Sequence, residues 1–210
     1  MYMSKVNMKF LLLLMSLTFA CSKECHYSTY NWNVNTTSVK NYKTVVKNYN
    51  EVKGFERNSL TGCSVCEEDQ IEIRLSNIKP FKVCKYLALD VERTLIHAMH
   101  TGAIIDSITG YRVGLTRGDV DEKGNRTEFS NHSFGIAIDI NAEHNGLYDH
   151  CKEFSSLCHL RKGGVWTLQN PKSLQETSMI VKNLKSIGLK WGGEIKGWQK
   201  DFMHFSPTGY

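Results

Sequence analysis

Two short stretches of the sequence carry residues that could bind a metal ion and move a proton. SNHSFGIAIDIN contains His132 and Asp139, and KDFMHF contains Asp201 and His204. Imidazole nitrogen and carboxylate oxygen both bind zinc, and a catalytic zinc site has three protein ligands and one open position. His132 and Asp139 alone are too few, so His204 is the natural third ligand. Their residue types therefore indicate a zinc centre of two histidines and one aspartate.

A zinc centre of this kind points to hydrolysis. Bound zinc lowers the pKa of its water ligand to about 7, which makes hydroxide available at neutral pH. A neighbouring carboxylate must then take up the proton and pass it to the leaving amine. Asp201 precedes His204 by three residues and is the candidate for this role.

The stretch FGIAIDI predicts a strand over residues 134–140, in which side chains alternate between two faces. The isoleucines form one apolar face, whereas Gly135, Ala137 and Asp139 form the other. Small residues beside a charge leave space for something that must satisfy the aspartate. Two simpler interpretations remain open, in which Asp139 caps a turn or pairs with Arg112. The remaining histidines are expected to be ordinary surface or core residues.

Hydrophobic periodicity predicts an α+β fold with a small, mainly antiparallel sheet and flanking helices. Apolar residues recur at helical spacing between residues 81 and 100, with a stop at Gly102, and a second helix is expected from Asn170-Pro171 to Gly188. We expect strands within residues 43–52, 70–76, 103–113, 134–140, 189–193 and 200–205, a loop over 114–131, and an irregular insertion at about 143–165.

The beginning of the sequence resembles an export signal. Lys5 and Lys9 precede the apolar run FLLLLMSLTFA, which is too short to span a bilayer. We assign residues 1–20 to a signal peptide, 21–42 to a polar tether or N-terminal arm, and 43–210 to the functional domain. LTFAC resembles an imperfect lipobox, so Cys21 is a possible lipid anchor. We expect a periplasmic or cell-envelope lipoprotein, or otherwise a secreted protein.

The cysteine count agrees with an oxidising compartment. There are seven cysteines, so six remain if Cys21 carries lipid, and six could form three disulfides in any of 15 pairings. Cys63 and Cys66 could form half of a zinc knuckle, but no partner Cys-x-x-Cys exists. Disulfide bonding is therefore the favoured interpretation, including a bond that closes the insertion.

Charge and size exclude some classes of function. The net charge of +5 falls to +3 without Lys5 and Lys9, and no basic run exceeds two residues. Such a weak positive charge does not predict binding to nucleic acid. The 210 residues, 41% of them hydrophobic, suffice for one well-buried domain, and we expect a monomer.

Taken together, the motifs resemble the zinc D-alanyl-D-alanine carboxypeptidase family, which includes vancomycin-resistance D,D-peptidases and phage L-alanyl-D-glutamate endolysins. The resemblance extends over about residues 83–205 and implies the hedgehog/DD-peptidase fold. It rests on Ser130-x-His132-x-x-Gly135-x-Ala137-x-Asp139, Trp191-Gly192-Gly193, Asp201-x-Met203-His204-Phe205 and the turn Gly110-Tyr111-Arg112.

The resemblance implies a role for each matching residue. His132, Asp139 and His204 would bind one Zn²⁺ ion, and Asp201 would act first as general base and then as general acid. Arg112 would stabilise the oxyanion or hold a substrate carboxylate. Substrate contacts are expected from Ser130, Arg112 and Trp191.

The implied substrates are peptidoglycan stem peptides. The bond cut would be that of a D-alanyl-D-alanine carboxypeptidase or of an L-alanyl-D-glutamate endopeptidase, and the sequence does not choose between them. A zinc-containing binding or signalling module of the same fold is the alternative, although the base Asp201 is present. A third interpretation is a structural lipoprotein in which His132 and Asp139 form a buried pair.

Overall fold

The computed structural model of the chain describes residues 23–210. The predicted signal peptide over residues 1–20 and the predicted lipidation of Cys21 lie outside the described residues. Within the described part, no helix is long and apolar enough to cross a membrane.

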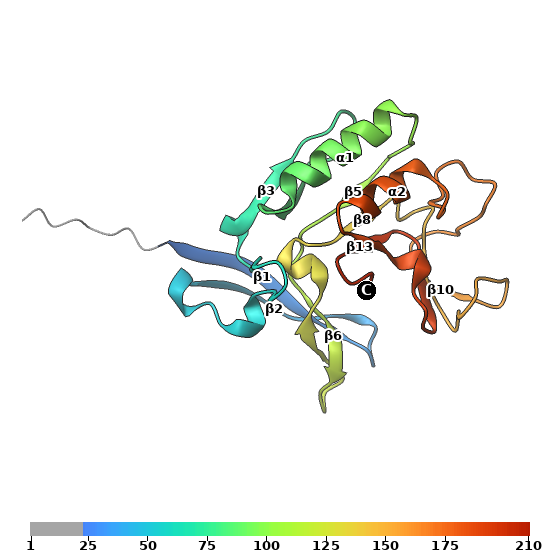
Figure 1. Cartoon of the computed structure of the whole chain (residues 1–210). Helices are drawn as coiled ribbons and strands as arrows, with labels where there is room; N and C mark the ends of the chain where they lie inside the picture. Colours follow the sequence, from blue (N-terminus) through green and yellow to red (C-terminus); the bar gives the residue numbers. More distant parts are fainter. Residues whose placement is uncertain (1–22) are drawn as a thin grey trace, which may run out of the picture.

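Four small sheets and two α-helices form the fold of residues 23–210 (Figure 1), which confirms the predicted α+β class. All strand pairs are antiparallel except the short contact between β1 and β6. In sheet order, the strands are β2 (Ser38–Asn48), β1 (Glu24–Asn33), β6 (Leu115–Val120) and β7 (Arg126–Phe129); β10 (His159–Lys162), β9 (Leu147–Asp149) and β12 (Gln199–Asp201); β11 (Lys190–Trp191), β13 (His204–Ser206), β8 (Ile138–Ile140) and β5 (Ile108–Thr109); and β3 (Gln70–Ile73) with β4 (Phe81–Cys84).

The main core lies where the two helices, α1 (Ala88–His100) and α2 (Met179–Ser186), pack on the sheet that contains β8 and β13. Leu95 of α1 and Leu184 of α2 are fully buried, together with Ile140 of β8. Burying one such side chain stabilises the fold by about 1.5–3 kcal/mol. This core fixes the positions of β8 and β13, the two strands that carry the candidate ligands Asp139 and His204.

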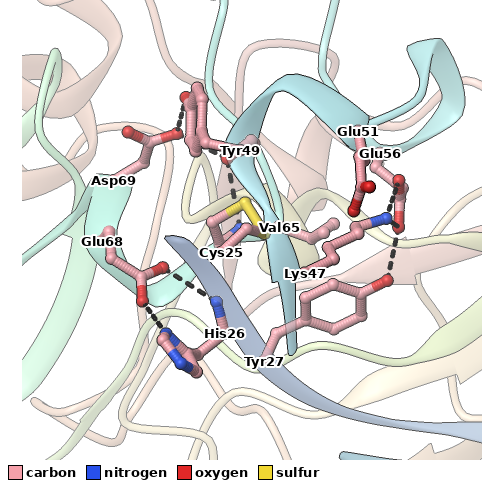
Figure 2. Close-up of a disulfide and its surroundings, with 12 residues drawn as sticks. Cys25, His26, Tyr27, Lys47, Tyr49, Glu51, Glu56, Val65, Glu68 and Asp69 are labelled. Atoms are coloured by element: carbon pink, nitrogen blue, oxygen red, sulfur yellow. Dashed lines mark hydrogen bonds and ion pairs between the residues drawn. A yellow bond between two sulfur atoms is a disulfide. The ribbon is translucent and has the colours of Figure 1, made fainter. Parts of the chain in front are cut away.

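Residues 24–48 form a hairpin of β1 and β2 and not the polar tether or arm predicted for residues 21–42. Cys25, Tyr27 and Thr29 alternate with more exposed residues and are buried. Figure 2 shows how the hairpin is attached: Tyr27 donates a hydrogen bond to Glu56, which also pairs with Lys47. The segment is therefore part of the folded protein.

Three disulfides confirm the prediction made from the cysteine count. They join Cys25 to Cys66, Cys63 to Cys84 and Cys151 to Cys158. The first two lie in a second buried cluster, which also holds Val65 and Ile136, and the first ties β1 to the segment before β3. Because Cys63 and Cys66 are both in disulfides, they do not form a zinc knuckle.

Both predicted helices begin later than the sequence indicated. Residues 81–84 form β4, which pairs with β3, and α1 starts only at Ala88. The second helix starts after Ser178, and Asn170-Pro171 precedes it in a non-helical segment. Both ends are as predicted, since Gly102 and Gly188 follow the helices with φ of +94° and +89°. Positive φ is costly for residues other than glycine.

Two segments predicted to be irregular contain hairpins. Residues 115–129, expected to be a loop, form β6 and β7. The insertion predicted at about 143–165 contains β9 and β10, and its tip is closed by the disulfide between Cys151 and Cys158. The insertion is thus an ordered extension whose strand β9 also pairs with β12.

Candidate metal centre

A sharp turn and a strand pair bring the three predicted ligands together. His132 lies in a short 3₁₀ turn, Asn131–Phe134, that ends at Gly135 with φ of +65°. A Cβ atom on Gly135 would lie 1.9 Å from a side-chain oxygen of Gln70, so only glycine fits there. The strand predicted over residues 134–140 therefore starts only at Ile138, and in it Asp139 pairs directly with His204 of β13.

The three side chains converge on one carboxylate oxygen. His132 Nε2 lies 3.0 Å from Asp139 Oδ1, and His204 Nδ1 lies 2.9 Å from the same oxygen. One possible ligand atom from each residue lies within 4.8 Å of the other two, and all three residues are buried. Neighbouring ligands around a tetrahedral zinc ion are separated by roughly 3.3 Å, given metal–ligand distances of about 2.0–2.1 Å.

The hydrogen bonding of His132 favours a cation at this place. Its Nδ1 lies 2.8 Å from the Gly110 carbonyl oxygen, which can only accept, so Nδ1 carries the hydrogen. In the neutral ring Nε2 then has only a lone pair, and that lone pair faces a carboxylate oxygen. Two acceptors in contact repel each other unless a positive charge lies between them. The residues present therefore fit a divalent metal ion.

The electrostatics of the three groups centre on the carboxylate of Asp139. Burial lowers the pKa of His132, which keeps the ring neutral. Burial would raise the pKa of Asp139, but its interactions with the two neighbouring imidazoles outweigh this effect and hold the pKa well below its usual value. For His204, burial lowers the pKa, but the hydrogen bond and charge of Asp139 outweigh burial, so the pKa is raised overall. An ionised carboxylate thus stands between two imidazoles.

Asp201 lies at the end of β12, beside this cluster. Burial raises the pKa of its carboxyl to about 6, because desolvation outweighs the attraction of His204. Its Oδ1 atom is buried with no hydrogen-bond partner. Gly192 makes room for this strand, because a Cβ there would lie 2.3 Å from the Asp201 main-chain oxygen. A carboxyl with this pKa can accept a proton near neutral pH and release it again.

The cluster opens into a cavity of about 580 Å³. Arg112 lies on its wall, with Nη2 3.6 Å from Asp139 Oδ2, so the pairing left open as a simpler interpretation of Asp139 is present beside the two histidine contacts. Ser130 also lines the cavity, and its hydroxyl lies 3.3 Å from that of Ser133. Five of the predicted site residues therefore meet at one cavity together with Asp201.

Trp191 is the predicted site residue that the structure places elsewhere. It is buried in the main core, its indole nitrogen donates to the Phe202 carbonyl oxygen, and it does not line the cavity. Trp191 therefore lies in the core beside Phe202, the residue that follows β12, and its expected substrate contact stays a prediction.

Several cavity residues were not predicted. Tyr30 and Trp32 of β1 form part of the wall, as do Arg117 of β6 and Lys162 of β10. All four belong to segments interpreted as tether, loop or irregular insertion. The concentration of tyrosine, threonine and tryptophan in HYSTYNW, residue types that favour strands, was the available signal in the first of these segments.

A buried cluster of two histidines and one aspartate, beside a buried carboxyl in an open cavity, is the arrangement expected of a metal-dependent hydrolase. Residues 123–207, less than half of the chain, match the D-alanyl-D-alanine carboxypeptidase family, which supports the resemblance that the motifs indicated. The matched region contains all three candidate ligands and Asp201, but not Arg112 or the β1–β2 hairpin. No curated protein and no solved structure matched the chain.

Proposed function

We propose that this protein is an exported zinc-dependent peptidase that hydrolyses peptidoglycan stem peptides. The observation that carries the proposal is the meeting of His132, Asp139 and His204 at one carboxylate oxygen, with Asp201 beside them. The match to a D-alanyl-D-alanine carboxypeptidase family supports peptidase activity. The three disulfides support an extracellular location.

His132, Asp139 and His204 would hold one Zn²⁺ ion. When bound, zinc supplies a Lewis acid that polarises the substrate carbonyl and makes a water molecule more acidic. The carbonyl oxygen of Gly110 orients His132 by accepting its Nδ1 hydrogen, as carbonyl and carboxylate groups commonly do for histidines that bind a metal.

Asp201 moves the proton. Its carboxylate accepts a proton from the attacking water and then donates it to the nitrogen of the scissile bond as the bond breaks. Burial favours this exchange, since it brings the pKa to about 6 and so close to neutral pH. An unpartnered Oδ1 atom is free to accept the hydrogen.

Arg112 and Ser130 orient the substrate. The guanidinium of Arg112 is partly exposed on the cavity wall, where it can stabilise the negative charge that develops on the scissile carbonyl oxygen. Ser130 can hydrogen-bond to the substrate main chain from the neighbouring wall. The cleavage products distinguish the two candidate bonds, D-alanyl-D-alanine and L-alanyl-D-glutamate.

The test is incubation of the purified protein, with disulfides intact, with peptidoglycan and with a synthetic stem pentapeptide. We expect mass spectrometry to show either release of D-alanine or a cut after L-alanine, and a chelator to stop it. Asp201→Asn should abolish turnover and keep the metal, whereas the exposed Asp119→Asn should be unaffected. Tight metal binding without cleavage of either substrate would contradict the peptidase and favour a binding module.

A further inference from the structure

A row of three residues crosses the sheet β10–β9–β12 at the edge of the cavity. Lys162 of β10 pairs with Leu147 of β9, and Leu147 pairs with Asp201 of β12. Residues opposite each other on neighbouring strands point to the same face, and all three line the cavity. With strands about 4.8 Å apart, the α-carbons of Lys162 and Asp201 lie roughly 10 Å apart. The flexible lysine side chain can bring its ammonium group across that gap.

The other cations of the cavity already have partners. Arg112 lies beside Asp139, and the Arg161 Nε atom lies 3.0 Å from Asp149 Oδ2. Arg117 donates a hydrogen bond of 3.1 Å to the main-chain oxygen of Tyr210. Among the cavity cations of residues 23–210, only Lys162 makes no ion pair or side-chain hydrogen bond, and it is exposed. Lys162 therefore holds a positive charge available to a ligand.

That charge acts near the proton donor. Burial raises the pKa of Asp201, and the positive charge of Lys162 acts against this effect. Asp201, in the proposed function, hands its proton to the nitrogen that leaves. When the released residue is an α-amino acid, a single carbon separates this nitrogen from the α-carboxyl group. A carboxylate on the leaving residue must therefore lie within a few ångströms of Asp201, which shares this row of the sheet with Lys162.

We propose that Lys162 is a specificity-determining residue that binds a free α-carboxylate on the leaving residue of the substrate. The inference rests on the proposed function. It narrows the substrate class to peptides in which the residue that supplies the nitrogen of the cut bond, the leaving residue, has a free α-carboxylate. Lys162 lies in the disulfide-closed insertion, so the insertion contributes directly to substrate selection. Arg112 remains available for the scissile carbonyl oxygen.

The test uses two substrates that differ only in this group, an α-carboxylate or an α-carboxamide on the leaving residue. The wild-type protein should prefer the carboxylate. Lys162→Met should lower kcat/KM for the carboxylate substrate by about 10- to 100-fold, the range for a lost charge-assisted hydrogen bond, and leave the carboxamide substrate nearly unchanged. Lys162→Arg should restore most of the preference. Lys152→Met is the matched control, because Lys152 is exposed in the same insertion and does not line the cavity.

Two outcomes overturn the inference. Equal losses on both substrates would mean that Lys162 does not recognise the carboxylate, and no loss on either would mean that it contributes nothing. If the wild-type protein cleaves neither substrate, the proposed function is contradicted, and the role of Lys162 in carboxylate binding is tested without catalysis. Calorimetry of the zinc-loaded protein with the free leaving amino acid and with its amide then tests Lys162 alone. Equal affinities, or a preference that survives in Lys162→Met, would contradict the inference.

Discussion

The Asp201 carboxyl should destabilise the metal-free protein, and replacing it with asparagine should stabilise the fold at neutral pH. The carboxyl is buried, and one of its oxygens has no hydrogen-bond partner. An ionised carboxylate in such a place has lost its hydration without full compensation. Asparagine has nearly the same shape and no charge, so Asp201→Asn removes the charge and keeps the packing.

The size of the effect follows from the pKa. Burial raises the pKa of Asp201 from 3.8 to about 6. A shift of roughly two units corresponds to about 3 kcal/mol, at about 1.4 kcal/mol per unit. Because the folded-state pKa is the higher one, both states are protonated below about pH 4 and the penalty is absent. The penalty grows as the unfolded state ionises and is complete above about pH 6 to 7.

Urea unfolding of the chelated proteins measures this penalty. The free energy of unfolding of Asp201→Asn, minus that of the wild type, should increase by about 2–3 kcal/mol between pH 4 and pH 7. Titrating groups that do not interact with Asp201 act equally on both proteins and cancel in the difference. Zinc should reduce the difference, since a nearby cation lowers the pKa of the carboxyl. A difference independent of pH would refute this account of Asp201, and Asp119→Asn, on the exposed part of β6, should show no such trend.

Three further predictions concern the framework of the site. Replacing both Cys25 and Cys66 with serine should lower the free energy of unfolding by about 4 kcal/mol, because this disulfide spans 41 residues; an unchanged urea midpoint would contradict that role. Asp69→Asn should destabilise the protein at pH 7, and the difference should vanish as the pH falls through the depressed pKa of Asp69. Burial opposes ionisation of this carboxyl, but hydrogen bonds from two lysines, a serine and a tyrosine stabilise the carboxylate. A stability difference between the two proteins that persists in acid would contradict this role of the ionised carboxylate. Gly114→Ala should raise KM and have little effect on thermal stability, because the new methyl group would lie 2.6 Å from the ring of Tyr30 and displace it on the cavity wall. An unchanged KM would show that this wall does not contact the substrate.

The sequence was most informative where residue type alone limits the chemistry. His132, Asp139, His204 and Asp201 were selected from their types and spacing, and the structure brings them together. The spacing could not show how they meet. The strand face predicted for residues 134–140 is interrupted by the turn at Gly135, and that turn places His132 on Asp139.

The sequence was least informative where the structure depends on contacts between distant segments. Residues 81–84 have apolar spacing that suits a helix, but pairing with residues 70–73 makes them a strand. The β1–β2 hairpin looked like a tether because its stability comes from a disulfide to Cys66 and from burial against later segments. Tyr30, Trp32 and Lys162 were missed for the same reason, since their segments reach the cavity only through long-range pairing.

The most direct test of the account is zinc titration of the chelated protein, with peptide hydrolysis and bound metal measured in parallel. We predict that hydrolysis recovers in proportion to zinc and reaches its maximum at one ion per chain. His204→Ala should lose both the tight site and the activity, whereas His150→Ala, at an exposed position outside this cluster, should keep both. Full hydrolysis without metal, or tight zinc binding that survives in His204→Ala, would contradict the central claim that these three residues form the catalytic metal site.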